Sequence, residues 1–387
     1  MNSETPVVYL DNAATTFPKP EAVYRDMDSV YRSSGGNAGR GANPLARRAA
    51  ALVAETRELA QTWLSAPEVT FSPSATIALN TIIFGANLRT GDVVYVSPFE
   101  HNSVARPLEH LRKTLGIVVR QLSYDKQTMV CNLDAIRAHF RIEPPSMICV
   151  SHVSNVFGIL SPVEELALLA RQASPSVIVL IDGAQSAGLV PLELANIDAL
   201  VFSGHKSLYG PYGIAGVAFG RDWRPAPFIY GGTGTRSESL DMPSNGSDRY
   251  EAGSQNISAV AGLRAALIWL KETGRCSIYD HVSSLTAQLT TTLAGLGGVF
   301  IYPSNSRVEH SSVVSFNING VSPQIVETAL GARSIAVRAG LHCAPWAHDF
   351  ASTLTQGGTV RTSLSFFNTE QDVLALAEAI DELLQHA

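Results

Sequence analysis

Short apolar runs alternate with longer amphipathic segments over the first 220 residues of the chain. The runs have the length and composition of buried strands, and they occupy Asp92–Ser97, Met147–Ser151, Val177–Asp182, Ala199–Ser203 and Ile214–Phe219. Helix-length segments lie among them at Pro44–Leu64, Thr76–Phe84 and Pro162–Gln172. Because parallel strands need long crossovers, usually helices, this alternation predicts an α/β fold with a mainly parallel central sheet flanked by helices.

The pattern changes after about residue 230. Residues 230–253 are rich in glycine, serine and arginine, which predicts a long functional loop rather than a linker. A helix is expected at Ile257–Thr273, and a mixture of strands and helices follows to the C-terminus. We therefore predict a large domain over residues 16–250, a smaller α+β C-terminal domain over residues 251–387, and an N-terminal segment, residues 1–15, associated with the small domain.

Composition narrows the class of protein without identifying it. The 387 residues are 45% hydrophobic and 16% charged, with a net charge of −6, which is typical of a globular protein and gives no reason to expect nucleic acid or a membrane as a partner. The first residues have no basic or apolar leader pattern, so a cytoplasmic location is expected. The four cysteines, Cys131, Cys149, Cys276 and Cys343, lack metal-ligand spacing, so neither a metal site nor a disulfide scaffold is expected.

Lys206 and Asp182 carry the most specific chemistry. Asp182 ends one apolar run, and Lys206 follows the next one within Ser203–Lys206. Pyridoxal 5'-phosphate (PLP) needs a lysine for its Schiff base and a carboxylate that keeps its ring nitrogen protonated. Alone, Asp182 fits a helix N-cap equally well, but the lysine at the end of a neighbouring strand favours PLP.

Other polar residues after predicted strands fit the same cofactor. Small hydroxylated residues at Ser72–Thr76 precede a helix, where they can bind a phosphate or act as ordinary N-caps. His101 can stack on the pyridine ring or be a surface histidine. Asn155 can reach the phenolic oxygen or a substrate carboxylate, or simply belong to a turn. Gln185, three residues beyond Asp182, can donate to the phenolic oxygen.

Taken together, the motifs resemble those of class V PLP enzymes of fold type I, and more narrowly the cysteine desulfurase family. They span nearly the whole chain in the family's order, at Tyr9–Thr16, Glu100–His101, Ser151–Asn155, Asp182–Gln185, Ser203–Lys206, Arg249–Ser254, Arg338–Cys343 and Val360–Leu364.

The resemblance implies a role for each matching residue. Lys206 would carry the cofactor and move protons, Asp182 would pair with the pyridinium, and His101 would stack on the ring. The remaining implied cofactor contacts are Gln185 and Asn155 at the phenolic oxygen, and Ala75, Thr76, Ser203, His205 and, from the second subunit of a dimer, Ser254 at the phosphate. The family often has threonine at the last position. The implied substrate contacts are Ala13, Asn155 and Arg361, the last as a bidentate clamp for the α-carboxylate.

Cys343 decides the reaction that the resemblance implies. Desulfuration needs a thiolate to accept the substrate sulfur, and nearby Arg338 and His342 could help keep a thiolate populated. The spacing alone favours an ordinary thiol, whereas Arg-x-Gly-x-His-Cys resembles the group II, Suf-like branch. Leu341 departs from the histidine common there, and residues 344–348 resemble a less characterised subgroup. His348 fits a role at the thiol or in packing, and residues 35–41 fit an entrance loop or a turn.

The expected function is therefore a PLP-dependent cysteine desulfurase that converts L-cysteine to L-alanine and leaves the sulfur on Cys343 as a persulfide. A homodimer with a shared active site, and an acceptor of unknown identity, for example in iron–sulfur cluster assembly, follow from the resemblance. Selenocysteine lyase, C–S β-lyase or another class V reaction remains an alternative. A protein that keeps this fold without turnover is a third.

Overall fold

The computed structural model describes residues 7–34, 36–39, 41, 43–235, 238–303 and 311–386. Its centre is a seven-stranded sheet in the order β2 (Glu68–Ser72), β8 (Ala215–Phe219), β7 (Ala199–Ser203), β6 (Ile178–Asp182), β5 (Met147–Ser151), β3 (Val93–Val96) and β4 (Val118–Gln121). Strands β7, β6, β5, β3 and β4 pair in parallel, whereas β8 is antiparallel to both of its neighbours. The predicted α/β class and the mainly parallel sheet are confirmed, and β8 is the exception that the alternation did not reveal.

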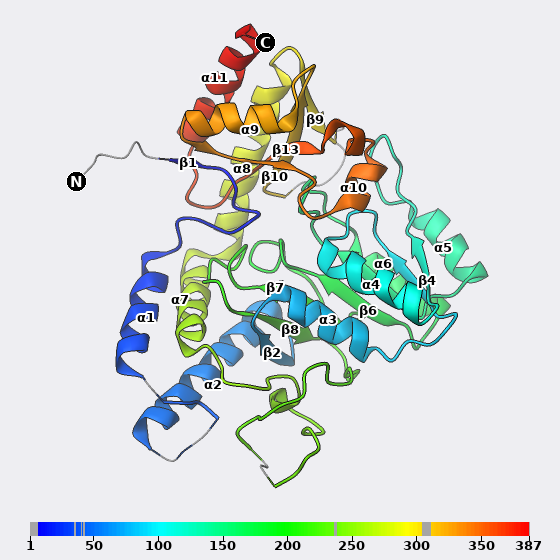
Figure 1. Cartoon of the computed structure of the whole chain (residues 1–387), viewed down its shortest axis with the longest axis vertical. Helices are drawn as coiled ribbons and strands as arrows, with labels where there is room; N and C mark the ends of the chain where they lie inside the picture. Colours follow the sequence, from blue (N-terminus) through cyan, green and yellow to red (C-terminus); the bar gives the residue numbers. More distant parts are fainter. Residues whose placement is uncertain are drawn as a thin grey trace.

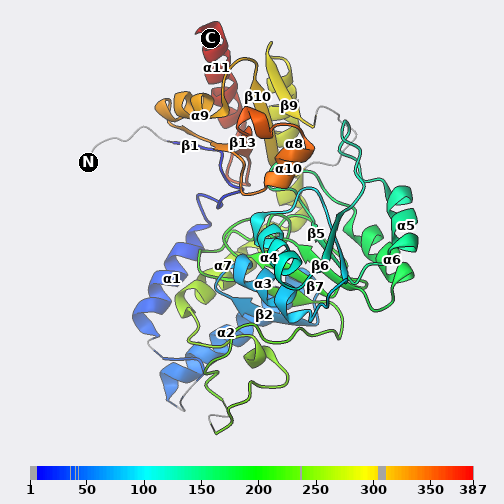
Figure 2. The ribbon, with the colours of Figure 1, turned by 45° about the vertical axis from the view of Figure 1, so that its right-hand side comes forward.

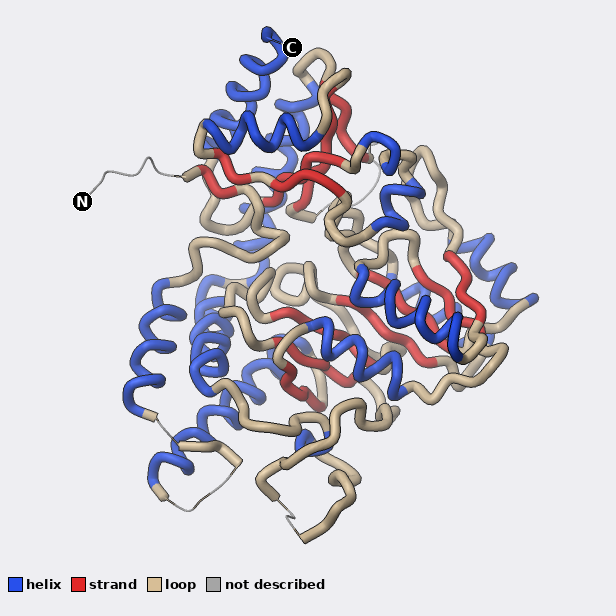
Figure 3. The backbone as a smooth tube through the Cα atoms, viewed as in Figure 1, coloured by secondary structure: helices blue, strands red, loops and turns tan. Residues whose placement is uncertain are grey.

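Side chains on the central strands alternate between two cores. On β6, Leu180 belongs to the core under α3 (Ala75–Gly85) and α4 (Asn102–Thr114), whereas Val179 and Ile181 belong to the core on the opposite face. That second face is covered by α2 (Pro44–Leu64), α5 (Leu133–Ile142) and α6 (Val163–Ala173), as Figures 1 and 3 show. Burial on both faces explains why these strands are continuous apolar runs rather than alternating patterns.

A second, antiparallel sheet forms the core of the smaller unit, at the top of Figures 1 and 2. Its order is β12 (Arg338–Gly340), β13 (Thr359–Ser363), β10 (Val313–Ile318) and β9 (Val299–Tyr302). The helices of this part of the chain are α8 (Arg275–Ala294), α9 (Pro323–Ala332), α10 (Pro345–Phe350) and α11 (Glu370–His386). Strand β1 (Val8–Tyr9) pairs in parallel with β11 (Ile335–Ala336), so the N-terminal segment lies beside the C-terminal part of the chain.

The helices between the two sheets bear on the predicted domain boundary. Helix α7 (Ile257–Thr273) packs against α1 (Glu21–Ser33) and α2, beside the large sheet. The first turns of α8 contribute Ile278 and Val282 to the core of the large sheet, and its later turns contribute Leu285 and Leu289 to the core of the small sheet. We therefore propose that the division passes through α8, rather than after residue 250 as the sequence suggested.

The segment 230–253 contains only a short 3-10 helix, Ser247–Arg249, among its described residues, and a second short 3-10 helix lies at Leu354–Gln356. The segment 230–253 projects at the bottom of Figure 1, away from the small sheet. In the part of the chain that the structure describes, no helix is both long enough and apolar enough to cross a membrane.

Gly188 lies where the turn after β6 packs against the turn that carries Lys206, so a substitution there tests how closely these two turns pack. A Cβ atom added at Gly188 would lie 1.7 Å from the carbonyl oxygen of Ser207. We expect Gly188→Ala to destabilise the fold by on the order of 3 kcal/mol, because neither backbone can yield without moving a turn at the sheet edge. The measurement is the midpoint of urea unfolding followed by circular dichroism.

Gly331→Ala is the matched control, because Gly331 lies in α9 and has no atom within 4 Å of the added Cβ. Its midpoint should be unchanged or slightly higher, since alanine is favoured over glycine in a helix. Equal midpoints for the two variants would contradict the predicted close packing at Gly188.

Candidate active site

A cavity of about 120 Å³ lies at the carboxyl ends of β5, β6 and β7. Ligands bind at this edge in doubly wound sheets. The structure brings nine of the ten predicted cofactor residues to its lining, namely Ala75, Thr76, His101, Asn155, Asp182, Gln185, Ser203, His205 and Lys206. Only Ser254 lies elsewhere.

Asp182 and Lys206 are both buried at this edge. Asp182 is 7% exposed and accepts a hydrogen bond at Oδ1 from the backbone N–H of Ala184, at 2.9 Å. Burial raises the pKa of the Asp182 carboxyl, and the Ala184 N–H and the Lys206 charge oppose this shift. Burial lowers the pKa of the Lys206 amine to about 8, although Asp182 pulls in the opposite direction. A fraction of the lysine is therefore neutral near pH 7, which is the form that can act as a nucleophile or base.

One end of the cavity is suited to a phosphate. Helix α3 begins at Ala75, and the side chain of its N-cap Ser74 accepts from the N–H of Ile77, at 3.3 Å. The free N–H groups and the dipole of a helix N-terminus favour an anion. His205 lines the same cavity, and its Nδ1 is buried and has no hydrogen-bond partner among the described residues.

His101 is the N-cap of α4, and its ring is fixed from one side. Nδ1 accepts from the backbone N–H of Ser103 at 3.0 Å, so the proton of the neutral ring lies on Nε2. Burial lowers the pKa of His101 to about 4, and the Lys206 charge contributes to the same shift. The imidazole is therefore neutral at pH 7, as stacking against a cationic ring requires.

Glu100 is a buried carboxyl to which the sequence analysis gave no role of its own. It accepts hydrogen bonds from Ser97 Oγ at 2.5 Å, Ser151 N at 2.8 Å and Ser151 Oγ at 2.9 Å. Burial raises its pKa to about 7, and these three donors oppose the shift. Glu100 thus connects the turn that carries His101 to the end of β5. Its position in the Glu100–His101 motif was the available sequence signal.

Arg361 lies on β13 and is 1% exposed. Its Nη2 donates to Asp11 Oδ1 at 2.6 Å, and its Nη1 donates to the backbone oxygen of Asn155 at 3.0 Å. Its Nε has no partner among the described residues. Gln185 donates to the backbone oxygen of Ala13 at 2.9 Å. Of the predicted substrate residues, Asn155 and Arg361 are thus bonded to each other, whereas Ala13 is bonded to Gln185. Asp11, whose pairing was not anticipated, balances the arginine.

Cys343 is an exposed thiol in the turn between β12 and α10. Its backbone oxygen accepts from the N–H of Asn102 at 2.7 Å, which places the turn beside the residue that follows His101. Arg338 Nη2 lies 3.9 Å from Cys343 Sγ. The cationic guanidinium of Arg338 is therefore next to the sulfur.

The expectation that His342 could help, as a charged group, to keep a thiolate populated at Cys343 is wrong. His342 is 3% exposed, and its Nε2 lies 3.0 Å from the backbone oxygen of Thr359, to which it donates. Burial lowers the pKa of His342 to about 2, so the ring is neutral at pH 7. His348 is fully buried, with Nδ1 2.8 Å from Thr353 Oγ1, so it does not touch solvent beside the thiol.

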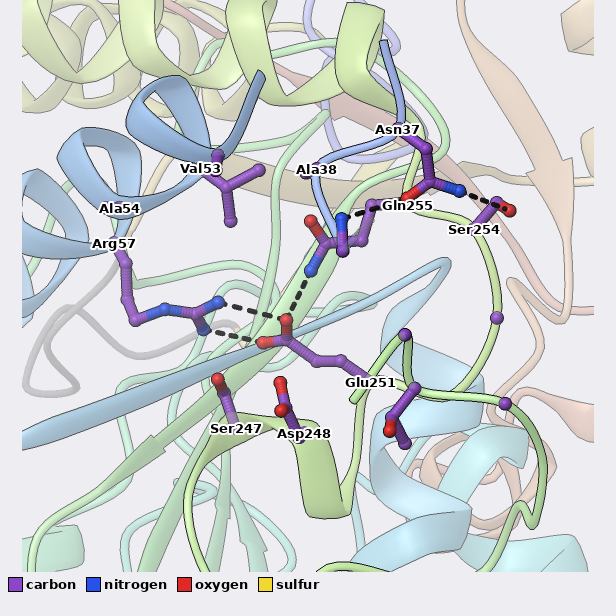
Figure 4. A pocket seen from close by; sticks show the side chains of 16 residues that line it. Asn37, Ala38, Val53, Ala54, Arg57, Ser247, Asp248, Glu251, Ser254 and Gln255 are labelled. Carbon is purple, nitrogen blue, oxygen red and sulfur yellow. Dashed lines mark hydrogen bonds and ion pairs between the residues drawn. The ribbon is translucent and has the colours of Figure 1, made fainter. Parts of the chain in front are cut away.

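Ser254 is exposed and lines a different cavity, of about 500 Å³, shown in Figure 4. Its Oγ accepts from Asn37 Nδ2 at 3.3 Å. Deeper in this cavity, Arg57 and Glu251 form a bidentate ion pair. Asn37 belongs to the predicted entrance loop 35–41, of which residues 35 and 40 lie outside the described residues.

Comparison with known proteins gives the family. The model of the class V aminotransferases matches residues 8–376. A probable cysteine desulfurase of Halalkalibacterium halodurans is 32% identical over 99% of this chain and 94% of its own length, and one of Methanothermobacter thermautotrophicus is 32% identical over 97% and 94%. The chain belongs to the class V aminotransferases, in the cysteine desulfurase family.

Solved structures agree with this family. The apo structure of the cysteine desulfurase from Thermococcus onnurineus has a TM-score of 0.89 and 29% identity, and covers 98% of this chain and 95% of its own. The cysteine desulfurase CsdA (S-sulfonic acid) from Escherichia coli has a TM-score of 0.85 and 30% identity, with the same coverage.

PLP is the cofactor of this family, and the cavity fits it. The α3 N-terminus and the unpartnered Nδ1 of His205 suit the phosphate. At the other end, the Asp182 carboxylate accepts only the Ala184 N–H from the described residues, which leaves acceptor capacity for a ring N–H. Lys206 lines the same cavity.

Buried neutral histidines predict that the protein is acid-sensitive. The pKa values of His152, His342 and His348 are lowered by burial to about 4, 2 and 4. Below pH 6.5 the unfolded chain binds these three protons and the folded chain does not, so stability falls as the pH falls. Glu100 acts in the opposite direction, because its raised pKa of about 7 lets the folded chain bind one proton that the unfolded chain releases. These four groups alone give an uptake of about two protons on unfolding, or roughly 3 kcal/mol per pH unit near pH 5.5. The lowered pKa values of His101 and His205, about 4 and 3, act in the same direction.

The measurement is the urea midpoint at pH 7.5, 6.5 and 5.5 at constant ionic strength. The midpoint should fall at the lowest pH. A midpoint that is constant or rises toward pH 5.5 would show that these histidines become protonated within the fold.

Proposed function

We propose that this protein takes the sulfur of L-cysteine onto Cys343 as a persulfide, releases L-alanine, and passes the sulfur to an acceptor. The observation that carries the proposal is the position of the thiol. Cys343 is exposed, Arg338 lies beside its sulfur, and its backbone is bonded to Asn102 at the rim of the Lys206 cavity. A thiol that is open to an acceptor and adjacent to the buried amine supports sulfur transfer.

The chain's residues have separate tasks in this proposal. Bound PLP supplies an electron sink for bonds at the substrate carbons next to the amino group. Arg361 binds the substrate carboxylate, for which its buried, partly unpartnered guanidinium is suited. Asp182 keeps the pyridine nitrogen protonated. Lys206, with a pKa lowered to about 8, holds the cofactor in the resting enzyme and then takes the proton from the substrate Cα.

The sulfur transfer balances with these groups alone. The Cys343 thiolate forms a bond to the substrate sulfur while the substrate C–S bond breaks, and the bonding pair stays with the carbon fragment. Protons return to that fragment and complete alanine, with Lys206 as the nearest buried amine. The persulfide is then removed by a thiol-containing acceptor or reductant. Asn155 and Gln185 would hold the cofactor ring at its phenolic oxygen, and His101 would cover one of its faces.

Replacement of Cys343 tests the proposal most directly. We expect Cys343→Ser to lower alanine formation from L-cysteine by about 100-fold or more, because serine cannot accept sulfur. The measurements are alanine, pyruvate and sulfide released in the presence of a thiol reductant. Bound PLP, followed by its visible absorption, should be unchanged.

Cys276→Ser is the matched control, since Cys276 is also an exposed thiol but lies on α8. It should keep full activity. Alanine formation that survives in Cys343→Ser, or pyruvate as the main product of the wild type, would exclude the proposed reaction.

We propose further that two copies share each active site. Ser254 is exposed and lines no part of its own Lys206 cavity, and the adjacent loop exposes Tyr230 and Leu240, at 70% and 105% of their surface. A second copy would cover these apolar side chains and bring its Ser254 hydroxyl to the phosphate.

A mixed dimer distinguishes sharing from a site within one chain. Lys206→Ala and Ser254→Glu should each be inactive as homodimers, the second because its carboxylate repels the phosphate. A heterodimer with one copy of each variant keeps one intact site if Ser254 acts across the interface. We expect about half of the wild-type activity in heterodimers purified through two different tags. No recovery would place Ser254 at the site of its own chain, and an active Ser254→Glu homodimer would place it away from both sites.

A further inference from the structure

The turn that carries Cys343 has a conformation that needs outside support. His342 and Cys343 both have positive φ values, 46° and 58°. Two successive non-glycine residues in the left-handed region are a strained arrangement. Within the turn, the N–H of Ala344 donates to the oxygen of Leu341 at 2.8 Å. This single bond does not account for the strained pair, so contacts from other elements must hold it.

His342 supplies these contacts through both its backbone and its side chain. Its backbone oxygen accepts from Asn155 Nδ2 at 2.7 Å. Its Nε2 lies 3.0 Å from the oxygen of Thr359 and 3.2 Å from Thr359 Oγ1. Thr359 begins β13, the strand that carries Arg361. One residue therefore ties the Cys343 turn to the strand of the carboxylate clamp and to the loop that holds its guanidinium.

The bonds continue into a buried chain. Thr359 Oγ1 donates to Ser315 Oγ at 3.1 Å, and Ser315 Oγ donates to the backbone oxygen of Val156 at 2.6 Å. Val156 follows Asn155, so this series of hydrogen bonds ends in the loop after β5, where the bond from Asn155 to His342 begins. Thr359 and Ser315 are fully buried, and no water competes with these bonds. In such surroundings these bonds favour one conformation, and the Nδ1 of His342 is the ring atom left without a partner among the described residues.

Burial also fixes the tautomer that this network needs. Since the lowered pKa keeps His342 neutral, only one ring nitrogen carries a proton, and the Thr359 oxygen selects Nε2 as the donor. The ring of His348 packs behind it, with centroids 5.6 Å apart. Turning the ring away would break the contacts of Nε2 with Thr359.

We propose that His342 is a positioning residue for sulfur transfer: its Nε2–H bond to Thr359 holds the Cys343 sulfur at a fixed place relative to Arg361. The proposal rests on the proposed function of Cys343 and adds how that thiol is aimed. Sulfur transfer requires a short distance between the Cys343 sulfur and the substrate sulfur, while Arg361 fixes the substrate by its carboxylate. A direct link between the two elements sets that distance within one small unit of structure.

Glutamine and leucine in place of His342 separate the hydrogen bond from the shape. A glutamine side chain would place its amide nitrogen where the imidazole has Nε2, and a leucine side chain fills the site without a donor. Histidine tolerates positive φ better than either replacement does, so the decisive comparison is between the glutamine and leucine variants, neither of which is favoured there. We therefore compare His342→Gln and His342→Leu in the PLP-loaded protein, by steady-state kinetics and by hydrogen exchange with mass spectrometry.

His342→Leu should lower kcat for alanine formation by about 100-fold, with little change in KM for L-cysteine, because a misplaced thiol affects the step after binding. Amide exchange should rise by about tenfold or more in residues 341–347 and at the start of α4, where the Asn102 N–H is bonded to Cys343. Exchange in α11 should be unchanged. His342→Gln should restore both properties to within about threefold of the wild type.

Unchanged exchange in His342→Leu, or identical behaviour of the two variants, would overturn the proposal. If the leucine variant does not fold, His342→Asn replaces it, because asparagine tolerates positive φ but is too short to reach Thr359. It should show the same exchange and kinetic defects as leucine. Exchange is measured independently of turnover, so a failure of the proposed reaction would appear as a wild type that makes no alanine, whatever the turn does.

Discussion

The buried guanidinium of Arg361 is the point on which the arrangement of this molecule converges. A charge that is 1% exposed is tolerated only where it is paired and hydrogen-bonded. Its partners, Asp11 and the oxygen of Asn155, come from the N-terminal segment and from the loop after β5 of the large sheet. Removing either partner would leave a buried charge or donor unpaired. The need to satisfy Arg361 therefore brings three distant parts of the chain to one place.

The elements that leave a local pattern in the sequence could be predicted from it. Helix α2 and strands β5 and β7 were predicted with the bounds that the structure has, because burial on both faces or on one helical stripe leaves a local pattern. The cofactor residues were also predictable, since most of them follow strands that end at the same sheet edge. The roles assigned to them stay predictions.

Features that depend on distant partners had no local pattern. The Asp11 to Arg361 pair joins residues 350 positions apart, and the antiparallel direction of β8 depends on its two neighbours. The position of α7 beside α1 and α2 likewise follows from tertiary packing. His342 was misjudged for a related reason. Its neighbour Cys343 is exposed, but the left-handed turn points the histidine inward, and only the fold reveals that its ring is buried and neutral.

The charges around Cys343 suggest why the cationic residue at the sulfur is Arg338 rather than a histidine. Arg338 and Arg361 are Cα partners across β12 and β13, and like charges at directly opposed positions repel. Asp11 balances Arg361, but among the described residues the guanidinium of Arg338 has only the Cys343 sulfur as a polar partner. Arg338 therefore lies opposite Arg361 with the Cys343 sulfur as its hydrogen-bond partner. His342, which burial keeps neutral, supports the turn without adding a third positive charge. The contact with the sulfur and the support of the turn therefore come from different side chains, Arg338 and His342.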